Sequence, residues 1–267
     1  MMTRVLSGTL LLAVVGSAVW FLEPIYLLAL AEIVALAGFM EYAQLAERMG
    51  AQVSRAAAGS ATLIVCAAVG VHGLPVDVAL MVATLGLAIV VLASGRRGAA
   101  ALHDVAASAF APLYLGLPLG ALVAVRWLVG REAALLLMLT IVLSDTAQLY
   151  CGRLLGRRLL APAISPKKTV AGAVGGFVAG VLGIAIVGRW WLPSVDLPWR
   201  IALGFAVVAV GMAGDLFESL LKRSAGVKDA SALIPGHGGV LDRIDALLFA
   251  APVFYIFARY RLVLFHP

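Results

Sequence analysis

The chain has 267 residues, of which 63% are hydrophobic and only 13% are charged, and its mean hydropathy is +1.05. Soluble domains average about 45–50% apolar and about 25% charged residues, and no polar stretch here is long enough to form one. The composition therefore excludes a soluble enzyme, and the formal net charge of +6 does not indicate a nucleic-acid-binding protein. Recurring apolar runs of roughly 18 or more residues predict an all-α, polytopic integral membrane protein.

About nine transmembrane helices are expected, and the turn between the first two, at Glu23 and Pro24, is very short. An N-terminal group of helices over residues 1–100 is expected to precede a C-terminal catalytic region over residues 101–267. The expected spans cover residues 5–22, 25–45, 57–73, 75–94, 104–126, 133–152, 170–190, 200–221 and 241–262.

The basic residues predict the orientation of these helices in the membrane. With nine spans, the N-terminus and the loops after the even-numbered spans lie on one side. That side holds 14 of the 20 Lys and Arg residues. Because cytoplasmic loops carry the excess of basic residues, the N-terminus is expected in the cytoplasm.

Acidic residues gather in three of the later spans. The sixth carries Asp145, the eighth Asp215 and Glu218, and the ninth Asp242 and Asp245. Ionisable groups at membrane depth are costly and mark functional sites. A spacing of three residues puts the acids of the eighth span on one helix face, and those of the ninth likewise. These carboxylates would repel one another unless some are protonated or a cation binds, and oxygen ligands favour a hard cation such as Mg²⁺.

A structural alternative assigns these acids to ion pairs with Lys222, Arg223 and Arg243. Those basic residues suit phosphate equally well, so the pattern favours a site for the set as a whole. Glu32 and Glu41 in the second span lack such surroundings, and a structural or interfacial role is expected for them.

Two polar loops, one between the sixth and seventh spans and the other between the eighth and ninth, have features that attract phosphate. In the first, Lys167 and Lys168 precede a helix that Ser165 or Thr169 is expected to cap. The second loop ends in PGHGG, a constrained turn whose backbone amides are accessible to phosphate. His237 lies in this turn, where it would donate to phosphate or ligate a metal indirectly. Together, the acids and loops indicate metal-assisted phosphoryl or nucleotidyl transfer on a membrane-embedded substrate.

The stretch SLLKRSAGVKDASALIPGHGGVLDRID, residues 219–245, resembles the signature of phosphatidate cytidylyltransferases, also called CDP-diacylglycerol synthases. We call it the signature segment. The preceding GDLFES and the region from Asp145 to SPKKT are also similar to family segments, although Val142 to Ser144 and Gln148-Leu149 depart from the family pattern. The positions in register are Ser219, Lys222, Arg223, Lys228, Asp229, Ser231, Pro235, His237, Gly238, Gly239, Asp242, Arg243 and Asp245.

The resemblance implies a Mg²⁺-dependent reaction in which CTP and phosphatidate give CDP-diacylglycerol and pyrophosphate. Asp215, Asp242 and Asp245 would hold the metal, and a second metal or a monovalent cation is left open. The catalytic set would be these three acids with Lys222, Arg243 and His237. The residues expected to bind substrate are Asp145, Ser165, Lys167, Lys168, Thr169, Ser219, Arg223, Lys228, Asp229, Gly238 and Gly239.

The expected location is a bacterial inner membrane, with the site facing the cytoplasm and membrane lipids as neighbours. The resemblance also suggests a homodimer. A related membrane CTP-dependent lipid kinase is the first alternative, and it would release CDP instead of pyrophosphate. An ion-coupled transporter is less favoured, because its acids would lie near the bilayer midplane within repeated halves.

Overall fold

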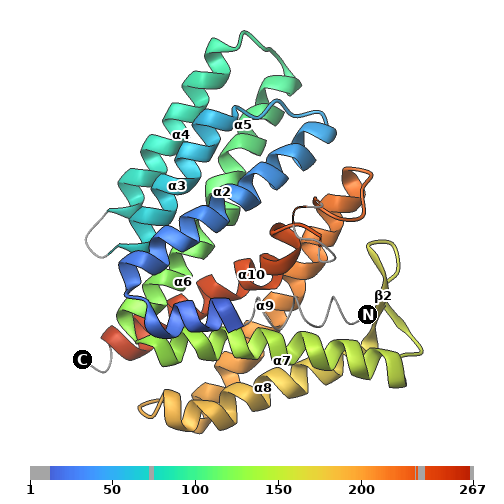
Figure 1. Ribbon diagram of the computed structural model, residues 1–267. Coiled ribbons are helices and arrows are strands. Elements are labelled where there is room, and N and C mark those ends of the chain that lie inside the picture. The colour runs from blue at the N-terminus through green and yellow to red at the C-terminus, as the bar shows by residue number, and fades with distance from the viewer. Residues whose placement is uncertain (1–12, 72–74, 232, 234–237, 265–267) are drawn as a thin grey trace. The chain divides into compact units, whose positions relative to one another are not determined.

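The computed structural model describes residues 13–71, 75–231, 233 and 238–264 (Figure 1). Residues 13–21 are helical, and Pro24 opens the next helix, so the expected short turn is confirmed. The elements are α2 (Pro24–Arg48), α3 (Arg55–Gly70), α4 (Val76–Ala93), α5 (Ala99–Ala111), η1 (Pro112–Gly116), α6 (Leu117–Leu128), α7 (Arg131–Leu155), β1 (Leu159–Ala161), β2 (Ser165–Thr169), α8 (Val170–Trp191), α9 (Leu197–Ser224), α10 (Leu241–Phe257) and η2 (Ala258–Leu264).

The predicted helical membrane protein is confirmed. Among the described residues, six helical segments are long and apolar enough to cross a membrane, and α3 is apolar but shorter. The ninth expected span corresponds to α10 and η2 together. The count of nine spans and the cytoplasmic N-terminus therefore stay predictions. The six segments are α2, α4, the continuous stretch Ala99–Leu128, α7, α8 and α9.

The loop expected between the sixth and seventh spans contains an antiparallel hairpin of β1 and β2. Leu159 pairs with Thr169, and Ala161 pairs with Ser165. The Ala161 carbonyl accepts a hydrogen bond from the Ile164 amide at 3.1 Å. Pro162 occupies the second position of this four-residue turn, where its fixed φ favours the bend. The sequence analysis did not anticipate these strands, because their residues do not alternate between apolar and polar. The turn at Pro162 explains why the chain folds back here.

The chain divides into two compact units, which we describe separately. Unit 1 comprises Met1–Ala124 and Leu221–Ile244, and unit 2 comprises Val125–Leu220 and Asp245–Pro267. These units are defined by packing, whereas the expected boundary near residue 100 concerned function and stays a prediction. The signature segment therefore contributes to both units.

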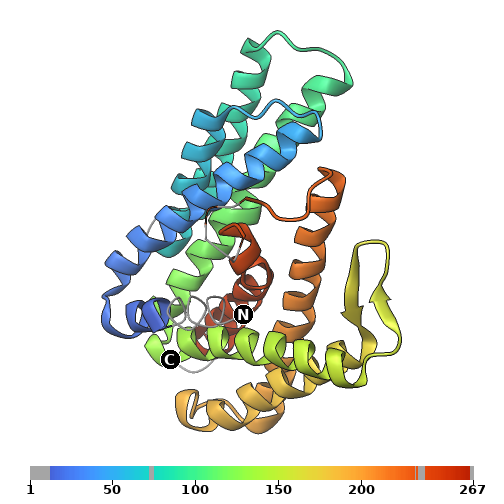
Figure 2. The ribbon, with the colours of Figure 1, turned by 45° about the vertical axis from the view of Figure 1, so that its right-hand side comes forward.

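In unit 1, helices α2 to α5 pack in sequence order, each against the next (Figures 1 and 2). The side chain of Phe39 is fully buried in α2. At one end of the bundle, the buried Asp104 carboxylate accepts a hydrogen bond from the Gln52 amide at 2.7 Å and pairs with Arg96 at 3.0 Å. Asp104 thereby ties the α2–α3 connection to the α4–α5 connection.

In unit 2, α7 packs along α8 (Figure 1), with Leu136 and Ile184 fully buried. Helix α9 approaches α10 where Gly214 stands. A Cβ atom at Gly214 would lie only 2.6 Å from the carbonyl oxygen of Asp245. The absence of a side chain at Gly214 therefore lets the backbone of α10 come close to α9, directly beside Asp215.

Candidate active site

The part of the site in unit 1 begins where α9 ends. Gly226 adopts a positive φ of 71°, and the amides of Ala225 and Val227 donate to the carbonyls of Leu221 and Lys222. Such a left-handed glycine is a common helix stop. The helix therefore ends just after Lys222 and Arg223, and the chain turns back toward the start of α10.

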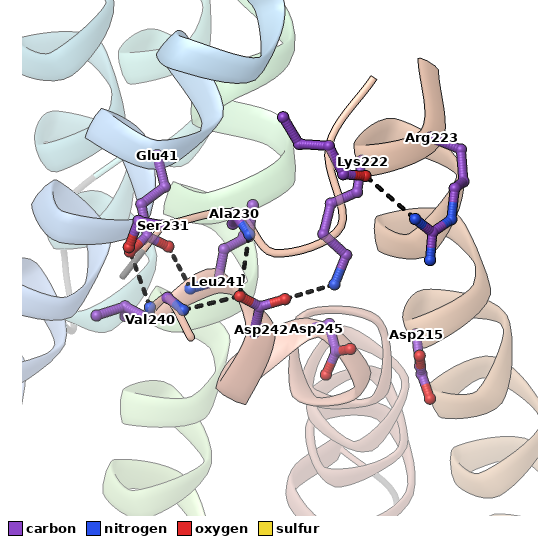
Figure 3. A network of polar contacts seen from close by, with 12 residues as sticks. Glu41, Asp215, Lys222, Arg223, Ala230, Ser231, Val240, Leu241, Asp242 and Asp245 are labelled. Atoms are coloured by element: carbon purple, nitrogen blue, oxygen red, sulfur yellow. Dashed lines mark hydrogen bonds and ion pairs between the residues drawn. The ribbon is translucent and has the colours of Figure 1, made fainter. Parts of the chain in front are cut away.

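The Asp242 carboxylate, in the first turn of α10, is the centre of a polar network (Figure 3). Its Oδ1 forms an ion pair with the Lys222 ammonium. Its Oδ2 accepts hydrogen bonds from the backbone amides of Ala230 at 3.1 Å and Gly239 at 2.8 Å. Only 7% of the Asp242 side chain and 12% of the Lys222 side chain are exposed. Asp242 is thus held in one orientation by donors from three parts of the signature segment.

Gly238 has the backbone conformation that this network requires. Its φ is +80°, in the left-handed region that favours glycine. A Cβ atom there would also lie 2.7 Å from Oδ2 of Asp242. A glycine at position 238 therefore allows the backbone to turn against the carboxylate and deliver the next amide to it.

Glu41 contacts the signature segment, a contact that the sequence analysis did not predict. It lies on α2 and is 3% exposed, and its carboxylate contacts the signature segment (Figure 3). Its Oε1 accepts from the Ser231 hydroxyl at 2.6 Å and the Val240 amide at 2.9 Å, and its Oε2 accepts from the Leu241 amide at 2.7 Å. The donors follow Glu41 by about 190 to 200 residues, so helical periodicity could not reveal the contact.

The part of the site in unit 2 includes an ion pair between Lys168 and Asp215. Strand β2 carries the lysine, and α9 carries the aspartate. The side chains are 19% and 27% exposed, respectively. The structure thus brings together a residue from the expected phosphate-binding loop and one of the expected metal ligands.

Further acidic residues surround Asp245 in unit 2. The charges of Asp215, Glu218 and Asp145 all act on its carboxylate. The Glu218 side chain is fully buried, whereas Asp145 is exposed and accepts a hydrogen bond from Gln148 at 3.0 Å. Acids from the sixth and eighth expected spans therefore act electrostatically on one acid of the ninth.

Thr169, one of the two residues expected to cap this helix, is the N-cap of α8. Its hydroxyl oxygen accepts a hydrogen bond from the Gly172 amide at 3.1 Å. Ser165 instead begins β2, where it is half-buried. The amides at the start of α8 thus lie next to the strand that carries Lys167 and Lys168.

The structural alternative of ion pairing is confirmed for Asp242, whose partner is Lys222. For Asp215 the partner is Lys168, which was not foreseen. Ser219 is half-buried, and His237 lies outside the described residues. The remaining expected phosphate-binding or orienting residues are exposed: Lys167, Arg223, Lys228, Asp229 and Arg243.

The donor chemistry of these acids suits a divalent metal, because Mg²⁺ prefers carboxylate oxygens. Within the part of the chain that the structure describes, no three His, Cys, Asp or Glu side chains gather as a metal-binding group. Lys222 and Lys168 neutralise Asp242 and Asp215 in the structure. The acids therefore fit a divalent metal by the chemistry of their oxygen ligands, while two of them are paired with lysines in the structure.

Comparison with known proteins addresses the chemistry of this site. A model of the cytidylyltransferase family matches residues 2–261. The chain is 40% identical over 154 residues to a phosphatidate cytidylyltransferase of Synechocystis, a match that covers 55% of this chain and 52% of the relative. It is 42% identical over 118 residues to that of Haemophilus influenzae, covering 43% and 41%, respectively. It is 43% identical over 122 residues to that of Aquifex aeolicus, covering 46% and 45%.

The matched part of the chain spans about half the length of these curated relatives. The family model, in contrast, extends over nearly the whole sequence and includes all the residues of both site parts. The chain therefore belongs to the cytidylyltransferase family.

Proposed function

We propose that the protein is a phosphatidate cytidylyltransferase, which converts CTP and phosphatidate to CDP-diacylglycerol and pyrophosphate in phospholipid biosynthesis. The observation that carries the proposal is the buried Asp242–Lys222 pair, which loop amides hold at the start of α10. It lies in the segment whose residue pattern resembles this family. The named relatives support the same substrates.

The chemistry requires two polyanions to meet in line. A phosphate oxygen of phosphatidate would attack the α-phosphorus of CTP, and the bond from that phosphorus to the β-phosphate oxygen would break. Pyrophosphate would leave with the bonding electrons. Because the phosphatidate oxygen is already anionic, no Ser or Cys nucleophile is needed. Positioning and charge neutralisation would supply most of the catalysis.

The basic side chains would hold the phosphates. Lys222 is largely buried beside Asp242, and its ammonium would be shared between this carboxylate and a bound phosphate. Arg223, Lys228 and Arg243 are exposed, as phosphate ligands must be before substrate binds. Lys167 and Lys168 on β2 would bind CTP or phosphatidate.

The polar residues that remain in the expected site would orient these basic groups or the ribose. Asp145 and Asp229 are exposed carboxylates suited to that role. Ser165, Thr169, Ser219, Gly238 and Gly239 would contribute hydroxyls or backbone amides to the substrate-binding loops. His237 would donate to a phosphate or support a metal ligand.

Mg²⁺ is the cofactor that the carboxylate chemistry favours, and Asp215, Asp242 and Asp245 would hold it. When bound, it would offset the negative charge on the CTP phosphates and on the leaving pyrophosphate. The three-residue spacing of Asp242 and Asp245 in the sequence, which puts both on one face of a helix, is the reason for assigning them to one set of ligands. A second metal or a monovalent cation would fit the same acidic surroundings.

The protein would work in the bacterial inner membrane, with its site facing the cytoplasm, where CTP is found. The excess of basic residues in the expected cytoplasmic loops supports this orientation. The acyl chains of phosphatidate would then enter sideways from the cytoplasmic leaflet, between helices. A homodimer is part of the proposal on the ground of family resemblance alone.

The direct test is incubation of the purified protein with phosphatidate, Mg²⁺ and CTP labelled at its α-phosphorus. Label should pass into the organic phase as CDP-diacylglycerol. Asp242→Asn should lower the rate by at least about 100-fold, because it weakens the proposed Mg²⁺ site and removes the charged partner of Lys222. Asp77→Asn is a matched control, since Asp77 is exposed in the first turn of α4. An inactive parent, or an unaffected Asp242→Asn, would contradict the proposal.

A further inference from the structure

Glu41 joins the middle of the loop that precedes α10 to the start of that helix. The Ser231 hydroxyl lies near the middle of the loop, and the amides of Val240 and Leu241 lie where the loop ends and α10 begins. All these residues belong to unit 1. Within the described residues, each hydrogen bond that the Glu41 carboxylate accepts comes from the signature segment. The carboxylate thus holds both this loop and the first residue of α10.

The contact also satisfies the start of α10. The first amides of a helix have no partner within the helix, and a negative charge beside them is favourable. Glu41 accepts the amide hydrogens of Val240 and Leu241, while Asp242 accepts those of Gly239 and Ala230 (Figure 3). Each of the two carboxylates thus accepts hydrogen bonds from two of the four backbone amides, and Leu241, which donates to Glu41, directly precedes Asp242. A shift of the helix start would therefore move Asp242.

The backbone of Gly239 packs closely against the Glu41 carboxylate. A Cβ atom at Gly239 would lie 2.4 Å from Oε2 of Glu41. The same residue donates its amide to Asp242. Gly239 therefore lies directly against the Glu41 carboxylate and also donates its amide to Asp242. A displacement of the Glu41 carboxylate would thus displace a donor to Asp242.

We infer that Glu41 is a positioning residue: it fixes the start of α10 and the signature loop, and thereby orients Asp242 for the transfer reaction. The inference rests on the proposed function. Glu41 reaches neither CTP nor lipid in this role. Its effect passes through Val240, Leu241 and Gly239 to the aspartate.

Glu41→Gln tests the inference with almost no change in volume. Glutamine has one acceptor oxygen, so its amide hydrogens must face at least one of the backbone N–H donors that Glu41 satisfies. Amide hydrogen exchange of Val240 and Leu241 should accelerate by about 10-fold in the absence of substrates. Exchange in the α2–α3 connection should stay as in the parent.

Two kinetic readouts separate positioning from a merely structural role. Per mole of folded protein, kcat should fall by about 10- to 100-fold, because small displacements of reacting groups are costly. The Mg²⁺ concentration for half-maximal rate should rise by about 10-fold, as it does when a residue that supports a metal ligand is lost. A structural role alone would lower the folded fraction and leave that concentration unchanged.

Glu47→Gln is the matched control, because Glu47 lies on the same helix and its exposed carboxylate pairs with Arg55. It should leave all three readouts unchanged. Ser231→Ala serves if Glu41→Gln does not fold, since it removes one of the three donors and should shift the same readouts less far in the same direction.

Parental exchange, kcat and Mg²⁺ dependence in a folded Glu41 or Ser231 variant would overturn the inference. A parent that makes no CDP-diacylglycerol would overturn the proposed function, and the exchange experiment would still report on the contact.

Discussion

Replacing Lys222 by Met tests the buried ion pair at the centre of the site. The change keeps most of the length of the side chain and removes its charge. Asp242 would then be a carboxylate with only 7% of its side chain exposed and no ammonium partner. We expect a large loss of stability in addition to the loss of activity.

The burial of the ion pair determines how large the loss of stability should be. Removing one partner of a buried ion pair costs about 3–5 kcal/mol. Asp242 would keep hydrogen bonds from the amides of Ala230 and Gly239, so the lower end of that range applies, about 3 kcal/mol. For a chain of this size, about 2–4 °C of melting temperature corresponds to each kcal/mol, which gives a decrease of about 6–12 °C.

The assay is thermal unfolding of the purified protein in detergent, followed by tryptophan fluorescence. Lys228→Met is the matched control for stability, because Lys228 is exposed in the same loop. Adding Asp242→Asn to Lys222→Met should recover about 2 kcal/mol relative to the sum of the single changes, since neither charge is then left alone. A Lys222→Met protein that melts with the parent, or strictly additive single changes, would refute the reasoning.

Two further substitutions test other parts of the site. Thr169→Ala removes the hydroxyl oxygen that accepts a hydrogen bond from the Gly172 amide, so the free energy of unfolding should fall by about 1 kcal/mol. Thr169→Ser keeps a hydroxyl and should retain most of the stability. Equal melting temperatures for the parent and Thr169→Ala would contradict the cap. Gly214→Ala puts a Cβ atom 2.6 Å from the Asp245 carbonyl oxygen, so it should force α9 from α10 and reduce both melting temperature and activity. A Gly214→Ala protein with parental values of both would show that this close approach is not required.

The elements that sequence predicted well are those set by local chemistry. The apolar runs predict helices because the bilayer requires internally bonded backbone, and the described helices match them. The cap at Thr169 follows from its place just before an apolar run. The grouping of Asp145 with Asp215 and Asp245 follows from helix spacing together with the rarity of acids in apolar helices.

The contacts that sequence could not predict join distant parts of the chain. Glu41 was expected to have a structural or interfacial role, because one Glu in an apolar helix has no local partner. Its partners lie in a loop about 190 to 200 residues away. The pairing of Asp215 with Lys168 depends likewise on a hairpin whose strands lack a strong pattern. In both cases tertiary packing, rather than local spacing, selects the partner.

The most direct measurement follows both ends of CTP in one reaction. Purified protein is given phosphatidate, Mg²⁺ and CTP that carries one label on the α-phosphorus and a different label on the γ-phosphorus. The proposed reaction predicts the α-label in the lipid and the γ-label in pyrophosphate, released in equal amounts, with both lost in Asp242→Asn. A γ-label in the lipid and CDP in solution would instead identify a CTP-dependent lipid kinase and contradict cytidylyl transfer.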